Sequence, residues 1–292
     1  MRGRGFIAAV AAAVALPLWA QTPAATGAAA LEPAQQLVRD VIYNELHDRE
    51  RDSYWEYRSA RVTATQNIVR EQVETADGPV FRVVAENGSA LDAEEREKEN
   101  QRLAAYVNDP AAIARAERAH LDDENHLAVA MQVLPQALLF EYEGSPTGDI
   151  ARIAFRPNPA YVPSGYEARI VHALSGTVTV DLRMKRMIAM QGVLAQRVDF
   201  GYGLLGHVDQ GGWFRIHRHQ VSAKHWKTDL VDVHAQGKLL MLKTVSRNER
   251  EVRSDFHPVP AGTTPEQARA MLEDAAEPRV QADLAPVPAA QK

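Results

Sequence analysis

Cysteine is absent from this chain of 292 residues. Its absence excludes disulfide bonds, cysteine-type zinc sites and a cysteine nucleophile. Aromatic residues are few, at 7%, so the composition does not point to a sugar-binding platform. Positive charge is not in excess either, because 33 Lys and Arg stand against 38 Asp and Glu, for a net charge of −5. This balance argues against a nucleic-acid-binding protein.

The rest of the composition is typical of a globular protein, with 46% hydrophobic and 24% charged residues. A chain of this length can bury a sizeable core, as one large domain or two small ones. Beyond the first twenty residues, no apolar run is long enough for a transmembrane helix, so we expect no membrane span in the mature chain.

The first twenty residues have the layout of a secretory signal peptide. Two arginines precede an apolar stretch rich in Ala and Val, which ends at Ala20. The stretch is too short to span a bilayer as a mature helix. We therefore expect a signal peptide at 1–20 and a linker at 21–31, with cleavage near Ala20 or at the alternatives Ala24 and Ala25. The mature protein is expected in the periplasm or outside the cell.

Residues 32–257 are expected to form one β-rich domain. A helix should follow Pro33, because apolar residues recur there on one side; they are Leu37, Val38, Val41, Ile42, Tyr43 and Leu46. Three strand-like runs follow, at 54–63, 67–75 and 80–86.

A helical insert is expected over 92–133. Asp92 and Glu95 have the spacing of a capping box, and Asp109-Pro110 is a helix start that begins a second helix. The expected inward line of that second helix is Ile113, Ala116, His120, Leu127, Met131 and Leu134.

From about Ala137 to Asp255, apolar and polar residues alternate with the period of a strand. The pattern predicts an antiparallel meander of about seven strands with one apolar face. The tail at 258–292 is expected to hold a short helix, begun by Thr264 and Gln267, before a Pro- and Ala-rich end. The predicted fold class is α+β: a curved antiparallel sheet or unclosed β-barrel, its apolar face covered by the N-terminal helix and the helical insert.

One hairpin can be given a register, with its turn at 222–225. The expected cross-strand pairs are Val221–Trp226, Phe214–Val233, Ile216–Val231, Arg218–Asp229, Arg215–Asp232, Trp213–His234 and His217–Leu230. Most of these pairs join side chains of like polarity or opposite charge, as a correct register should.

Histidines are the first candidates for chemistry. His217 and His219 share one strand face, a geometry that a divalent ion could use, with His225 and His234 on the partner strand. In the expected register no carboxylate completes a third ligand beside the first pair. A solvated polar face explains them more simply, and we predict no metal and no cofactor.

Other catalytic patterns are also weak. His120 and Glu124 lie one helical turn apart, but with His126 they do not form the HExxH zinc motif. The glycines at 201–206 match GxGxxG, yet a strand follows them, so we expect a close connection in the sheet. No GxSxG elbow is present, and paired carboxylates such as Glu94 and Glu95 fit a solvated helix face. We therefore predict a protein that is not an enzyme.

Charge is distributed unevenly along the chain. Residues 92–124 carry ten acids and five bases, a net of −5, whereas residues 183–253 carry thirteen Lys and Arg and six acids, a net of +7. The acidic helices could dock on the basic sheet, or the basic sheet could face anionic lipid or a partner.

The order of elements resembles the periplasmic lipoprotein-carrier superfamily. The segment 175–192, Ser-Gly-Thr-Val-Thr-Val-Asp-Leu-Arg-Met-Lys-Arg-Met-Ile-Ala-Met-Gln-Gly, is similar to that family's strand, basic turn and second strand. The chain also resembles uncharacterised exported proteins of soil bacteria in Phe155-Arg-Pro-Asn-Pro159 and Gly203-Leu-Leu-Gly206. Over roughly residues 33–257 the resemblance implies an unclosed β-barrel whose helices cover a cavity for acyl chains. It implies no catalytic residues.

Three functions remain open at this point. The first is a carrier or receptor for an apolar ligand, such as a lipid or a lipoprotein acyl chain. The second is a non-catalytic structural or interaction protein of the envelope with a filled barrel, and the third is a metal-dependent hydrolase. The expected partners are accordingly a lipid, a lipoprotein or an envelope protein, and no nucleic acid. The residues expected to line a ligand cavity are Phe140, Phe155, Val180, Met190, Phe214, Ile216 and Val233 from the sheet, and Ile113, Leu127 and Met131 from the helices.

Overall fold

The computed structural model describes residues 31–47, 53–200, 206–239 and 243–274. The fold described below belongs to the compact unit that begins at Pro33. The expected signal peptide, nearly all of the expected linker, most of the GxGxxG segment and the Pro- and Ala-rich end of the tail lie outside the described residues.

Five helices and thirteen strands make up the described residues. The helices are α1 (Ala34–His47), α2 (Ala93–Val107), α3 (Pro110–Ala137), α4 (Tyr166–His172) and α5 (Pro265–Asp274). The strands are β1 (Tyr54–Thr63), β2 (Asn67–Val73), β3 (Val80–Glu86), β4 (Ser89–Ala90), β5 (Leu138–Tyr142), β6 (Ile150–Pro157), β7 (Leu174–Asp181), β8 (Arg186–Leu194), β9 (Val198–Phe200), β10 (Gly206–Val208), β11 (Trp213–Gln220), β12 (Trp226–Leu239) and β13 (Lys243–Val259).

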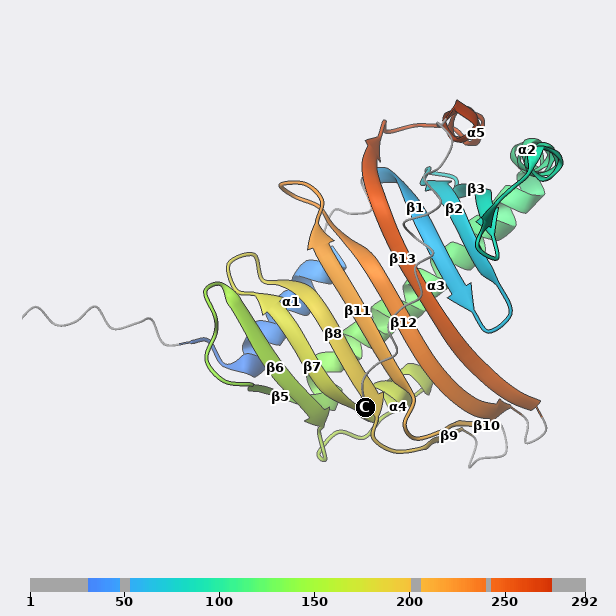
Figure 1. The fold of residues 1–292 in the computed structure, drawn as a ribbon. Coiled ribbons are helices and arrows are strands. Elements are labelled where there is room, and N and C mark those ends of the chain that lie inside the picture. Colours follow the sequence, from blue (N-terminus) through green and yellow to red (C-terminus); the bar gives the residue numbers. More distant parts are fainter. Residues whose placement is uncertain (1–30, 48–52, 201–205, 240–242, 275–292) are drawn as a thin grey trace, which may run out of the picture. The chain divides into compact units, whose positions relative to one another are not determined.

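All strands belong to one antiparallel sheet with the order β4-β3-β2-β1-β13-β12-β11-β8-β7-β6-β5 (Figure 1). The short β9 and β10 pair with each other, and β10 also pairs with β12. The outer strands β4 and β5 do not pair, so the sheet is not closed. The expectation of an α+β fold on an unclosed antiparallel sheet is confirmed, whereas the expected seven strands after residue 137 are nine. The periodicity did not reveal β9 and β10, because three residues are too few to establish alternation.

The first helix packs on one end of the sheet. Its side chains Leu37, Val38, Val41 and Ile42 are buried in a core with residues of β5 to β8. Tyr43, expected on this apolar side, is instead 61% exposed and stacks on His47.

Local capping chemistry sets where the inserted helices begin. Asp92 and Glu95 form the expected capping box at α2, and the Asp109 carboxylate caps α3. The third helix continues to Ala137, four residues beyond the expected end, with Pro135 inside it. It packs against α1, α2, α4 and β5, and Figure 1 shows it crossing behind the strands. No helix of the described residues is long and apolar enough to cross a membrane.

At the other end of the sheet, α5 packs on β2 and β3. Ala268 and Leu272 are buried with Val73 and Val80. The expected capping box of Thr264 and Gln267 at the start of α5 is present.

The β11–β12 hairpin confirms five of the expected pairs, from Trp213–His234 to His217–Leu230. The register then shifts, so that Arg218 pairs with Thr228 and Gln220 with Trp226. The expected pairs of Arg218 with Asp229 and of Val221 with Trp226 are therefore wrong. The cause is a β-bulge, an extra residue in one strand that alternation alone does not reveal.

A buried ion triad joins α1 to the sheet. The Glu45 carboxylate accepts hydrogen bonds from Arg186 Nε at 3.2 Å and Nη2 at 3.1 Å, and from Arg218 Nη1. The Met187 backbone N–H donates to the same carboxylate at 3.0 Å. All three charged side chains are nearly inaccessible to solvent, that of Glu45 being 1% exposed. One carboxylate thus connects the end of α1 to β8 and β11.

Replacing Glu45 with Gln should destabilise the fold by about 3–5 kcal/mol, because two buried guanidinium groups lose the negative charge of Glu45. Urea unfolding followed by circular dichroism measures the loss. The matched control is Glu141→Gln, which removes an exposed partner of Arg156 and should cost less than about 1 kcal/mol. Equal losses in the two variants would contradict a stabilising role for the triad.

Candidate functional site

The strand register shows that one face of the sheet has apolar side chains on some strands and charged side chains on their neighbours. Met190 pairs with Ile216, Ile216 with Val231, Val231 with Glu251, and Glu251 with Arg61. Directly paired residues in antiparallel strands point to the same side, so these five side chains share a face. Because Met190 lies in the core with α1, we call this surface the α1-side face.

The part of the α1-side face on β5 to β8 is filled. Phe140, Phe155, Val180 and Met190, four of the expected cavity residues, are buried in one core with side chains of α1. A Cβ on Gly192 would lie 3.1 Å from the Phe155 ring and 2.9 Å from the Phe214 ring. Those rings therefore occupy the space that a larger residue would need.

The middle of the α1-side face is less covered. Phe214, Ile216, Val231 and Val233 are all only half-buried, and they lie on the neighbouring strands β11 and β12. We call these four residues the apolar strip. Three of them (Phe214, Ile216 and Val233) were expected to line a cavity. Phe214 borders the filled core, where Met131 of α3 also packs.

The third helix is packed near both ends but not along its middle. Leu127, Met131 and Leu134 have the i, i+4, i+7 spacing of one helix face. Leu134 is buried and Met131 half-buried, yet Leu127 is 58% exposed. Earlier on the same line Ile113 is half-buried and His120 exposed. The expectation that Leu127 and His120 face a covered interior is wrong for these two residues, since both are exposed among the described residues.

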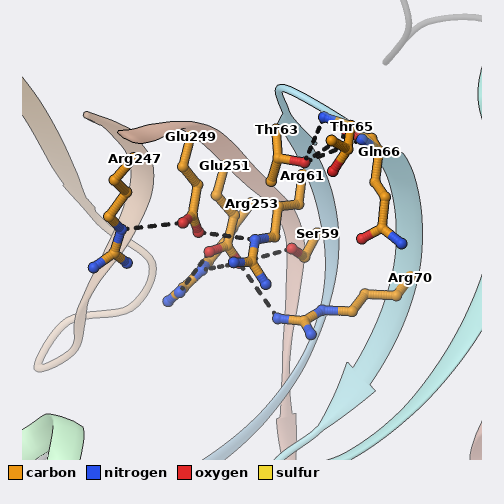
Figure 2. Close-up of polar contacts among 10 residues, drawn as sticks. All are labelled: Ser59, Arg61, Thr63, Thr65, Gln66, Arg70, Arg247, Glu249, Glu251 and Arg253. Carbon is orange, nitrogen blue, oxygen red and sulfur yellow. Dashed lines mark hydrogen bonds and ion pairs between the residues drawn. The ribbon is translucent and has the colours of Figure 1, made fainter. Parts of the chain in front are cut away.

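Next to the apolar strip, the α1-side face becomes charged. Glu251 of β13 is buried and accepts hydrogen bonds from Ser59 Oγ at 2.7 Å and Arg253 Nε at 2.9 Å (Figure 2). Arg70 of β2 approaches the same carboxylate at 3.7 Å. Glu249, two residues away, contacts Arg61 of β1 at 2.8 Å.

Arg247 completes this group, with its Nε 3.2 Å from Glu249 (Figure 2). We call Arg61, Arg70, Arg247 and Arg253, with Glu249 and Glu251, the guanidinium cluster. These arginines pair with acids of the sheet itself. The earlier alternative, docking of the acidic helices on the basic sheet, has no support from these contacts.

The cluster was missed in the sequence analysis, although β13 contains a signal for it. Arg247, Glu249, Glu251 and Arg253 alternate with other residues, which places all four on one face of a strand. Their meeting with Arg61 and Arg70 could not be foreseen, since it depends on the pairing of β13 with β1 across most of the chain.

Ionisation in the cluster follows from burial and pairing. Burial raises the pKa of the Glu251 carboxyl, but the hydrogen bonds and charge of Arg253, with Ser59 and Arg70, outweigh it and lower the pKa below its usual value. Burial raises the pKa of the neighbouring Tyr57 to about 12. Glu251 is thus a stable anion and Tyr57 is neutral at physiological pH.

The histidines lie on the opposite sheet face. His217 Nδ1 is 2.7 Å from one Asp229 oxygen, and His219 Nδ1 is 3.0 Å from the other. The sequence register gave no carboxylate beside this pair; the β-bulge supplies one. Because a carboxylate only accepts, both rings donate from Nδ1. Among the described residues, no group of three or more His, Asp or Glu is arranged to hold a metal ion.

A pocket of about 310 Å³ lies where β1, the β11–β12 turn and the end of β13 meet. Trp55, His225 and Pro258 are among its lining residues. Ser222 Oγ lies 2.7 Å from His225 Nδ1, a contact between two residues of the same turn. His234, the other histidine expected near the pair, stacks on Trp213.

Lowering the pH should weaken the fold through Glu251. A carboxyl with a lowered folded-state pKa stabilises the fold fully above its ordinary pKa and loses that contribution as the pH falls through the folded value. The free energy of unfolding of Glu251→Gln should therefore lie below that of the wild type at pH 7, with the gap closing towards pH 3. Urea titrations at several pH values measure it, and a constant gap would contradict the assignment.

Comparison of the chain with protein-family models, with curated proteins and with solved structures gives no match.

Proposed function

We propose that this chain is an exported, non-catalytic protein that binds an apolar ligand, such as the acyl chain of a lipid or lipoprotein, as a carrier or receptor. The ligand would lie on the apolar strip, within the unclosed sheet. The observation that carries the proposal is the exposure of Leu127 on a helix line whose later members, Met131 and Leu134, are packed into the core.

Two incompletely covered apolar surfaces support this proposal. The strip side chains of β11 and β12 are half-buried although they continue the face on which the core is built. Leu121, Leu127 and Val129 of α3 are exposed by 45–58%. A partly uncovered row of apolar side chains on neighbouring strands, such as the apolar strip, is typical of a site that binds an apolar group. In this proposal α3 acts as the cover of the bound ligand.

The alternative is a structural or interaction protein of the envelope. The filled core beneath α1 favours it, because Phe140, Phe155, Val180 and Met190 leave their part of the sheet without room for a ligand. The two functions differ at the apolar strip, which must admit a ligand in the first and need not in the second.

Export is a part of the proposal that rests on the sequence of residues 1–20. If the protein is expressed in a bacterium with a periplasm, the mature form should begin close after Ala20. Mass analysis of the exported protein measures this, and an intact Met1 would contradict the signal peptide.

Folded protein should take up a neutral fluorescent dye such as Nile red and release it when an alkyl ligand is added. Val231→Asn should weaken dye binding about tenfold, because it replaces apolar contact surface with an amide. The matched control is Val252→Asn on the opposite face of the neighbouring strand, which should leave the affinity unchanged.

Absence of dye uptake by the folded wild type would reject the carrier and favour the structural protein. Equal effects of the two Val variants would place the dye elsewhere.

A further inference from the structure

The guanidinium cluster carries more positive than negative charge. Four arginines surround two glutamates, which leaves two formal positive charges unbalanced within the cluster. Of the nearby groups, Tyr57 is neutral, and Glu74 is matched by Lys227 at 3.3 Å. An excess of guanidinium groups on a partly covered surface attracts anions.

The guanidinium group of Arg70 also has an N–H donor that is not used within the described residues. The carboxylate of Glu251 is occupied by Ser59 and Arg253, so that Arg70 reaches it only at 3.7 Å. In the described part of the chain, Arg70 Nε is buried and has no hydrogen-bond partner. A guanidinium group has five N–H donors in a planar fork that fits carboxylate and phosphate oxygens.

This charge lies directly beside the apolar strip. Val231 and Val233 of β12 pair with Glu251 and Glu249 of β13, so apolar and charged side chains are neighbours on one face. Arg61 lies on the next strand, β1, and Arg70 on β2 beyond it. Adjacent strands are separated by about 4.8 Å, so a single small amphiphile can contact both surfaces.

We infer that the ligand of the α1-side face is an anionic amphiphile, whose alkyl chain lies on the apolar strip and whose head group binds Arg61 and Arg70. The inference rests on the proposed function and adds the chemical class of the ligand. A carboxylate and a phosphate would use the same guanidinium donors. A fatty acid would supply a carboxylate head group and a phospholipid a phosphate head group. The two differ in charge, and the experiment below distinguishes them.

The test compares three ligands that share a dodecyl-length chain. They are dodecanoate, dodecyl phosphate and the neutral monododecanoyl glycerol. Each displaces Nile red from the folded full-length protein below its aggregation concentration. At least one anion should bind about tenfold more tightly than the neutral ligand, as charged hydrogen bonds contribute on that order. The stronger anion identifies the head group.

Arg70→Gln should remove most of that preference and leave the affinity for the neutral ligand within about twofold. Arg61→Gln should act in the same direction and serves if Arg70→Gln does not fold, as judged by circular dichroism. The matched control is Arg215→Gln, an exposed arginine on the opposite face of β11, which should change neither affinity.

Equal affinities for the anionic and neutral ligands would overturn this inference and leave the proposed function standing. A preference for anions that survives both Arg variants would also overturn it, since the head group would then bind elsewhere. If the folded protein takes up no dye and binds none of the three ligands, the proposed function itself is rejected.

Discussion

The fold depends on one carboxylate placed among cations. Glu45 lies near the C-terminus of α1, where the helix dipole disfavours a negative charge. Arg186 and Arg218 compensate for that position and for the loss of water around all three groups. Such a triad tolerates little displacement, because a buried charge without its partner is costly. The position of α1 on β8 and β11 is therefore tightly specified.

The position of α1 decides how the single sheet face is used. Beneath α1 the side chains of β5 to β8 form a filled core. At the far end, Leu103 of α2 and Leu272 of α5 pack with Val73 and Val80, which lie on the opposite face of the sheet because Val73 pairs with Glu56. The apolar strip and the guanidinium cluster lie beyond the core on the α1-side face, on four consecutive strands from β11 to β1 together with β2. The same alternation of side chains that builds the core also builds the proposed site. What differs along the face is how completely helices cover it.

Local signals were sufficient for many elements. Asp92, Asp109 and Thr264 mark helix starts because capping involves residues within one turn of each other. The hairpin register was correct as far as His217, because paired strands joined by a short turn have few alternatives. It failed at Asp229, where a bulge changes the pairing without changing composition. The same bulge brings that carboxylate to His217 and His219.

The helix starts, the alternation of side chains between the two faces of each strand, and the absence of cysteine chemistry can all be read from the amino-acid sequence. These follow from interactions between residues close in the chain. The exposure of Leu127 beside packed residues of the same helix line depends on the packing of the whole chain. So do the contacts of Arg61 with Glu249 and of Arg70 with Glu251. Both depend on strand order and helix placement, which arise from contacts between segments nearly two hundred residues apart. Periodicity reports which side of an element is apolar, whereas packing decides what lies against that side.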